Sequence, residues 1–136
     1  NSKLSENKID GKNIWEVLIN KTDKSPHEAL FFYYHVNSLH AVRYGDWKMY
    51  FPHRYRTLSG REGRNDGTPI KYEYVNLETM ELYNLVKDPS ESKNLIEEYP
   101  EIAKKIEMLA DIKRNEIGDD LTKIKGTENR PVGMID

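Results

Sequence analysis

The chain has 136 residues, of which 37% are apolar and 32% charged, and its net charge at pH 7 is −2. This balance fits one domain with a modest core, and nine tyrosines and two tryptophans argue against disorder. The small net charge predicts no strong attraction to nucleic acid or to an anionic membrane. No apolar run reaches the roughly 20 residues of a membrane span, and the lack of cysteine excludes disulfides, thiolate metal sites and cysteine nucleophiles.

The N-terminal third contains one short helix and one strand by its pattern. The first eleven residues lack the basic-then-apolar order of a signal peptide and are expected to be a polar linker. In KNIWEVLIN, Ile14, Trp15 and Leu18 recur at helical spacing and predict a short helix. The run ALFFYYHVN predicts a strand with apolar side chains on both faces, which indicates that both faces are covered.

The next segment, SLHAVRYGDWKMYF, predicts a β-hairpin, because two strand-like runs flank Gly45-Asp46 and glycine at the first central position suits a type II′ turn. Residues 52–69 contain three glycines and two prolines and are expected to form a long loop. KYEYVNL then alternates as a strand, and MELYNL is its expected antiparallel partner.

A helix is expected to follow. Asp88-Pro89-Ser90-Glu91 carries a helix-start signal, with Asp88 as N-cap and Pro89 at the first helical position. Pro100 restarts the helix, which presents Ile102, Ile106 and Leu109 on one stripe as far as Gly118. Four or five strands and one long C-terminal amphipathic helix predict an α+β fold of two layers, in which the helix covers one face of the sheet.

Few side chains suggest chemistry. The histidines form no H-x-x-x-H or His-carboxylate cluster and read as ordinary surface or half-buried residues, and the acidic pair Asp119-Asp120 reads as solvated charge at the helix end. The segment FPHRYRTLSGREGR differs, because it gathers cations in a slightly acidic chain: His53, Arg54, Arg56, Arg61 and Arg64. Arginine forks bind oxyanions, so this segment fits an anionic ligand, acidic groups of a neighbouring domain, or a solvated basic loop.

The stretch ELYNLVKDPSESKNL resembles the signature E-L-Y-[DN]-L-x-x-D-P-x-E-x-x-N-L near the C-terminus of sulfatases of the arylsulfatase A type. Further segments resemble parts of the same sulfatases in the same order: IDGKNIWEVL, AVRYGDWKMYF, FPHRYRTLSGREG and GDDLTKIKG…RPVG. The resemblance covers nearly the whole chain, and chance explains such an ordered set of motifs poorly.

The resemblance implies the C-terminal subdomain of a bacterial-like sulfatase, without the catalytic N-terminal domain. It also implies the fold of that subdomain, α+β, with a small four-stranded antiparallel sheet packed against a long C-terminal amphipathic helix. In that family the catalytic domain carries a formylglycine, made from the Cys or Ser of C/S-x-P-x-R, and a divalent cation, usually calcium. This sequence has neither that motif nor the carboxylate cluster. The chain is therefore expected to contain no catalytic residue, metal site or cofactor of its own and to be inactive alone.

The same resemblance sets the expected boundaries and partners. Residues 1–11 would be a linker from the missing catalytic domain, 12–118 the subdomain and 119–136 an extended tail. The parent protein, periplasmic or secreted, would hydrolyse a sulfate ester such as a sulfated carbohydrate. The N-terminal catalytic domain would be the partner of this chain, with no nucleic acid and no membrane span involved.

Loops of this subdomain can form part of the substrate-pocket rim in such enzymes. His53 matches the FPHxYR position and is the first expected substrate contact, followed by Arg54 and Arg56, whose cations would favour an anionic sulfate ester. Arg43, in the matched A-V-R segment, is expected to be structural.

Two other functions stay open. The chain fits a stand-alone binding module for sulfated or other anionic sugars that uses the arginine loop, which salt-sensitive binding would favour. It also fits a purely structural domain that docks an apolar face onto a partner, which self-association without ligand binding would favour.

Overall fold

The computed structural model describes residues 11–129, so most of the expected linker and residues 130–136 of the expected tail lie outside it. Two helices and eight strands are formed in this part of the chain. They are α1 (Trp15–Leu18), β1 (Ala29–Tyr34), β2 (Ser38–Tyr44), β3 (Trp47–Tyr50), β4 (His53–Thr57), β5 (Glu73–Leu77), β6 (Glu81–Asn84), α2 (Pro100–Ile117), β7 (Gly118–Asp119) and β8 (Ile124–Lys125).

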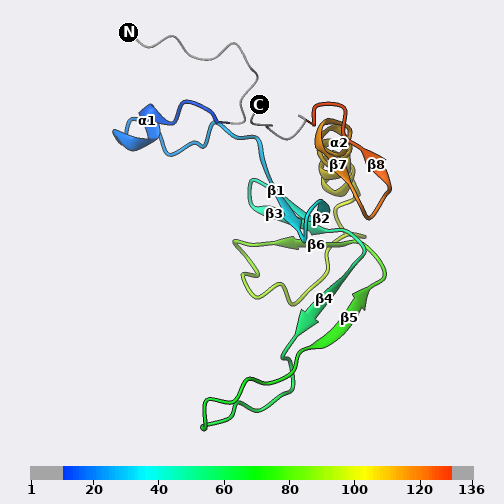
Figure 1. Ribbon diagram of the computed structural model, residues 1–136. Helices are drawn as coiled ribbons and strands as arrows, with labels where there is room; N and C mark the ends of the chain where they lie inside the picture. Colours follow the sequence, from blue (N-terminus) through cyan, green and yellow to red (C-terminus); the bar gives the residue numbers. More distant parts are fainter. Residues whose placement is uncertain (1–10, 130–136) are drawn as a thin grey trace, which may run out of the picture.

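The main sheet has four antiparallel strands in the order β1-β2-β3-β6, and α2 lies against one of its faces (Figure 1). This confirms the predicted α+β fold class. The short helix predicted around Trp15 is α1, and the hairpin predicted at Gly45-Asp46 joins β2 to β3. Gly45 has a φ of +56° while Asp46 is not among the residues with positive φ, which is the pattern of the predicted type II′ turn.

The core lies between α2 and the sheet. Alternate residues of the strands point toward the helix, and every third or fourth residue of the helix points back. The buried cluster consists of Leu39, Val42, Met49, Phe51, Leu82, Ala103, Ile106 and Ala110. Ile106, from the predicted apolar stripe, is fully buried, and burial of such a side chain stabilises the fold by roughly 1.5–3 kcal/mol.

The opposite face of the sheet is open at β1. Leu30, Phe32 and Tyr34 are 49%, 44% and 44% exposed, while Phe31 and Tyr33 on the other face pack against the core. The prediction that both faces of this strand are covered is therefore wrong for the described residues, because α2 reaches only one of them.

Part of the expected loop 52–69 is a strand. β4 pairs antiparallel with β5, with His53 opposite Leu77 and Arg56 opposite Tyr74, and the two strands form a ribbon that projects from the body of the domain (Figure 1). All five residues of HRYRT pair with the five residues of EYVNL in one register without a bulge. Only the residues between the two strands form a loop.

The helix start predicted at Asp88 is wrong, and α2 begins twelve residues later, at Pro100. The carboxylate of Asp88 accepts hydrogen bonds from the backbone N–H groups of Ser92 (2.7 Å) and Lys93 (2.9 Å), which closes a loop instead of starting a helix. Glu91 has a φ of +54°, a left-handed conformation that cannot continue an α-helix.

The chain after α2 returns to the sheet. Residues from 119 onward, expected as an extended tail, begin with the short β7–β8 pair. Asp119 is fully buried and bonds to Arg114, so the expectation that Asp119 is a solvated helix-end charge is wrong. Among residues 11–129, neither helix combines the length and hydrophobicity needed to cross a bilayer.

Candidate functional site

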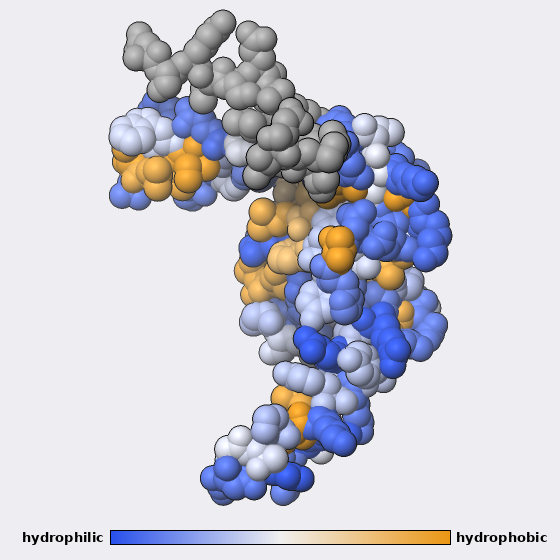
Figure 2. All heavy atoms as spheres, viewed as in Figure 1, coloured by the Kyte–Doolittle hydropathy of each residue, from blue (hydrophilic) through white to orange (hydrophobic). Residues whose placement is uncertain are grey.

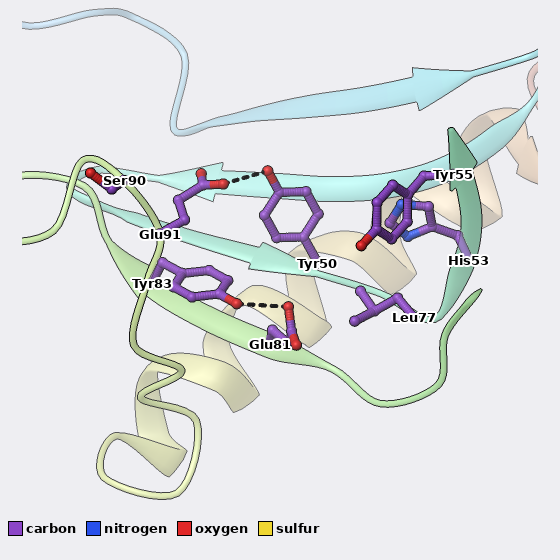
Figure 3. A pocket seen from close by; sticks show the side chains of 8 residues that line it. All are labelled: Tyr50, His53, Tyr55, Leu77, Glu81, Tyr83, Ser90 and Glu91. Carbon is purple, nitrogen blue, oxygen red and sulfur yellow. Dashed lines mark hydrogen bonds between the residues drawn. The ribbon is translucent and has the colours of Figure 1, made fainter. Parts of the chain in front are cut away.

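A pocket of about 360 Å³ lies between the ribbon, the sheet face that α2 leaves uncovered, and the loop after β6 (Figure 3). On β3, Lys48 and Tyr50 alternate with Met49, so they face away from α2, and Tyr50 pairs across the sheet with Glu81 of β6. The pocket is lined by Tyr50, His53, Tyr55, Leu77, Glu81, Tyr83, Ser90 and Glu91.

At one end of the pocket, Glu91 is fixed by two partners. It accepts hydrogen bonds from Lys48 Nζ (2.8 Å) and from the Tyr50 hydroxyl (2.8 Å), and Lys48 also contacts that hydroxyl. Burial, the largest single effect, acts to lower the pKa of Lys48, but the hydrogen bonds and charge interactions with Glu91 and Tyr50 together outweigh it, and the pKa is raised. Burial raises the pKa of Tyr50. Lys48 therefore stays charged and neutralises Glu91.

The second carboxylate has a different environment. The Tyr83 hydroxyl donates to Glu81 Oε2 at 2.7 Å (Figure 3), and burial together with this bond raises the pKa of Tyr83, so the phenol stays protonated. No cation within the described part of the chain forms an ion pair with Glu81. The pocket therefore carries one carboxylate charge that no side chain of residues 11–129 compensates.

His53 closes the other end of the pocket. Its ring stacks on His40 with centroids 3.9 Å apart, and its Nδ1 lies 2.6 Å from the carbonyl oxygen of Phe51. Because a carbonyl can only accept, Nδ1 carries a proton in this bond. The tautomer is thus fixed, and Nε2 remains available to a ligand hydroxyl.

The stacked pair predicts a pH dependence of stability. Burial, then His53 and His35, lower the pKa of His40 from 6.5 to about 4. Between pH 4 and 6.5 the unfolded chain binds more protons at His40 than the folded chain does, so a lower pH favours unfolding. The free energy of unfolding is therefore unaffected by His40 above pH 6.5 and decreases as the pH falls toward 4. We expect His40→Phe, which keeps a stacking ring, to reduce the decrease in the free energy of unfolding over this pH range by about 1 kcal/mol. The effect is this small because solvent screens the charge on a partly exposed ring.

Urea unfolding of the chain at several pH values from 4 to 7 measures this effect. His27→Phe, on an exposed loop, is the matched control and should leave the profile unchanged. A His40→Phe profile that runs parallel to that of the unsubstituted chain would refute the assignment.

The structure separates the three predicted site residues. Only His53 lines the pocket, because Arg54 and Arg56 alternate with it and lie on the other face of the ribbon. There the Arg54 guanidinium lies 4.3 Å from the Tyr74 ring centre and that of Arg56 lies 4.8 Å from Tyr72. Arg43 donates from Nε to the carbonyl oxygen of Gly45 at 3.0 Å, an arrangement in keeping with the structural role expected for it.

The pocket has the chemistry of a binding site for hydroxyl-rich molecules. Aromatic rings stack on the apolar face of a sugar, and fixed phenols, carboxylates and an imidazole bind its hydroxyl groups. Ser90 and His53 lie at opposite ends of the pocket (Figure 3) and do not form a nucleophile–base pair. Across residues 11–129, no group of three or more His, Asp or Glu side chains could hold a metal ion.

Most of this pocket is not identifiable from the sequence. The sequence pattern assigns Tyr50, Glu81 and Tyr83 only to strands, and it places Glu91 in a helix cap. The alternation of Lys48 and Tyr50 on one strand against Glu81 and Tyr83 on the next is a usable signal, but the pairing of β3 with β6 is needed to bring these residues together.

The fold and the pocket define a small α+β domain that carries binding chemistry on one sheet face. The sequence model of the family described as the C-terminal region of aryl-sulfatase matches residues 25–132, and the chain belongs to this family. A comparison with curated proteins found no match.

Thirteen solved chains match, among them one from Bacteroides thetaiotaomicron with 24% sequence identity and a TM-score of 0.59. That structure is described as "Metabolism of multiple glycosaminoglycans by bacteroides thetaiotaomicron is orchestrated by a versatile core genetic locus", with a designation ending in 6S-sulf. The match covers 83% of this chain and 22% of that chain, and at this identity it supports the fold alone.

Proposed function

We propose that this chain is the C-terminal subdomain of a sulfuric ester hydrolase of the aryl-sulfatase type, and that it supports a catalytic domain and supplies part of the substrate-pocket rim. The family match over residues 25–132 carries this proposal. The chain spans about a fifth of the length of the solved relative, which leaves ample length for a catalytic domain elsewhere in a parent protein.

The uncovered sheet face is the surface proposed to meet the catalytic domain. Leu30, Phe32 and Tyr34 expose apolar surface there, on the same side as the pocket (Figure 2 shows where apolar side chains reach the surface in one view of the molecule). Contact with a second domain would remove this surface from water, and each Å² of apolar surface buried would stabilise the contact by roughly 25 cal/mol. The pocket would then lie at the edge of the interface, where a substrate held by the catalytic domain could reach His53 and Tyr55.

The chemistry of the reaction would come from that other domain. The formylglycine and calcium expected in such enzymes do not fit the residues described here, since the chain has no cysteine, no C/S-x-P-x-R motif and, in residues 11–129, no set of side chains suited to a metal. We propose that the chain alone does not hydrolyse sulfate esters, and that the parent acts outside the cytoplasm.

The substrate class proposed is a sulfated carbohydrate. The uncompensated Glu81 would repel a sulfate, so the pocket suits the neutral hydroxyl groups of a sugar, while the sulfate would be held in the catalytic domain. The description of the solved relative names glycosaminoglycans, which are carbohydrates of this class, but this naming applies to that protein and does not define the sugar here.

Substitution of His53 in the parent protein tests the proposal. We expect His53→Ala to raise KM for the sulfated substrate about tenfold and to change kcat by less than about twofold, since one hydrogen bond to bound sugar is lost and the reacting groups lie elsewhere. Steady-state kinetics measure both constants, and His27→Ala serves as the control. Unchanged kinetics for His53→Ala would exclude the rim role, and a parent protein without sulfatase activity would exclude the function.

A further inference from the structure

The ribbon presents a second polar surface on the face opposite His53. Along β4, Arg54 and Arg56 lie on this face about 7 Å apart, as expected for residues two apart on a strand. The guanidinium of Arg54 lies over the ring of Tyr74, which is on the partner strand β5. The guanidinium of Arg56 lies over the ring of Tyr72, the residue just before β5. We call these four residues the arginine–tyrosine ladder.

The contact with the tyrosine rings leaves hydrogen-bond donors of the arginines available. A guanidinium over an aromatic ring is attracted through its charge and does not use its N–H groups as conventional hydrogen-bond donors to do so. Arg54 makes no hydrogen bond or ion pair to any residue in the described range, and Arg56 makes one hydrogen bond, from Nη2 to the Tyr34 hydroxyl at 2.7 Å. By contrast, Arg61 is bonded to Glu73 and to the carbonyl oxygen of Lys71. The ladder thus holds two preorganised forks with donors to spare.

The surrounding charge favours an anionic ligand. Residues 53–77 carry five arginine and lysine residues against three acidic residues, whereas the whole chain has a net charge of −2. The ladder tyrosines are also open, with Tyr72 52% and Tyr74 58% exposed. Open aromatic rings beside arginine forks offer a stacking surface for a sugar ring next to bidentate sites for sulfate or carboxylate groups.

We propose that the arginine–tyrosine ladder is a binding surface for an extended anionic polysaccharide, separate from the pocket on the other face of the ribbon. Two forks in line along a strand fit anionic groups that repeat along a polymer, and a single small sulfate ester would occupy only one of them. The choice of a sulfated sugar rests on the proposed function; the ladder itself follows from the contacts within the ribbon. Its role is to hold the polymer while another part of it enters the pocket.

Binding of dextran sulfate to the full-length protein that carries this chain tests the ladder, with unsulfated dextran as the uncharged probe. We expect binding to dextran sulfate that weakens as salt is raised, and no binding to dextran. The double variant R54A/R56A should bind on the order of tenfold more weakly, since two charge-assisted contacts are lost. R64A removes one exposed loop arginine from the same ribbon and should bind as the unsubstituted protein does.

The lysine variant R54K/R56K separates fork geometry from charge alone. It should bind more weakly than the unsubstituted protein and more tightly than R54A/R56A, because charge remains but planar stacking and bidentate donation are lost. Equal binding by R54A/R56A and the unsubstituted protein, or an equal loss in R64A, would overturn the proposal. So would a full-length protein that does not bind dextran sulfate at low salt, which would show that another domain covers the ladder.

Failure of the ladder and failure of the proposed function give different results. Hydrolysis of a small aryl sulfate by the full-length protein tests the hydrolase assignment and does not need the ladder. The titration with dextran sulfate tests the ladder and does not need hydrolysis. Each result therefore stands whatever the outcome of the other.

Discussion

Replacing Asp119 by alanine is expected to lower the free energy of unfolding by about 3–5 kcal/mol, a large part of the total for a domain of this size. Asp119 is fully buried. Its Oδ1 accepts the backbone N–H groups of Leu39 (3.2 Å) and Leu121 (3.0 Å), and its Oδ2 accepts Arg114 Nε (2.9 Å). One carboxylate therefore ties β2, the end of α2 and the β7–β8 pair together.

The cost arises mainly from the groups left behind. Without Asp119, the N–H of Leu39 loses its acceptor, and the buried Arg114, which lies 4.3 Å from the centre of the Phe51 ring, keeps Asp111 as its one ion-pair partner among residues 11–129. Urea unfolding measures the loss, and Asp120→Ala, at an exposed neighbouring carboxylate, should stay within about 0.5 kcal/mol.

A second substitution identifies the cause of this loss. The double variant D119A/R114M removes the unpaired guanidinium and should be more stable than D119A alone. If D119A lost less than about 1 kcal/mol, or if R114M made it worse, the buried pair would not have the role assigned to it.

Local patterns determined the parts of the fold that were predictable. Glycine at 45 followed by Asp46 specifies a tight hairpin whatever surrounds it, and the stripe of Ile102, Ile106 and Leu109 specifies a helix with one buried face. The resemblance then supplied the four-stranded antiparallel sheet, but the pairing expected between KYEYVNL and MELYNL was wrong, because β5 pairs with β4 and β6 pairs with β3. These features depend on residues close together in the chain, or on a whole set of motifs in order.

The errors occurred where a distant partner decides the local conformation. Asp88-Pro89 carries every local sign of a helix start, but Glu91 reaches Lys48 and Tyr50 on β3 and adopts a left-handed conformation on the way. Asp119 looks like solvated charge until β2 packs beside it, because its carboxylate accepts the N–H of Leu39, 80 residues earlier in the chain. Pairing across 41 or 43 residues cannot be deduced from the composition of either segment.

The candidate site was predictable in its residue types but not in its grouping. The sequence prediction puts His53, Arg54 and Arg56 on one loop, where side chains have no defined faces. Recognition of HRYRT as a strand opposite KYEYVNL would have placed His53 apart from both arginines by strict alternation, and put the arginines beside the tyrosines. The long glycine-bearing segment that follows Thr57 outweighed the alternation of the five residues before it.

Gly126→Ala should be the most damaging of the small substitutions. Gly126 passes directly over the junction of α2 and β7, where an added Cβ would lie 2.3 Å from the carbonyl carbon of Ile117 and 2.6 Å from the amide nitrogen of Gly118. Both neighbours are backbone atoms, which cannot move aside as a side-chain end can. We expect a loss of more than about 3 kcal/mol, measured by urea unfolding.

The site of the damage should be visible as well. The chain can relieve the clash only by lifting residues after Gly126 off α2, which breaks the bonds from the Thr127 N–H to the Asn115 carbonyl oxygen and from the Glu128 N–H to that of Glu116. Those two amides should exchange with solvent much faster in Gly126→Ala, while the amides of the main sheet keep their protection. Gly63→Ala, where an added Cβ meets nothing within 4 Å, should change neither stability nor exchange. Equal behaviour of the two alanine variants would mean that the backbones do not approach so closely, and that the return of the chain from α2 to the sheet has a different path.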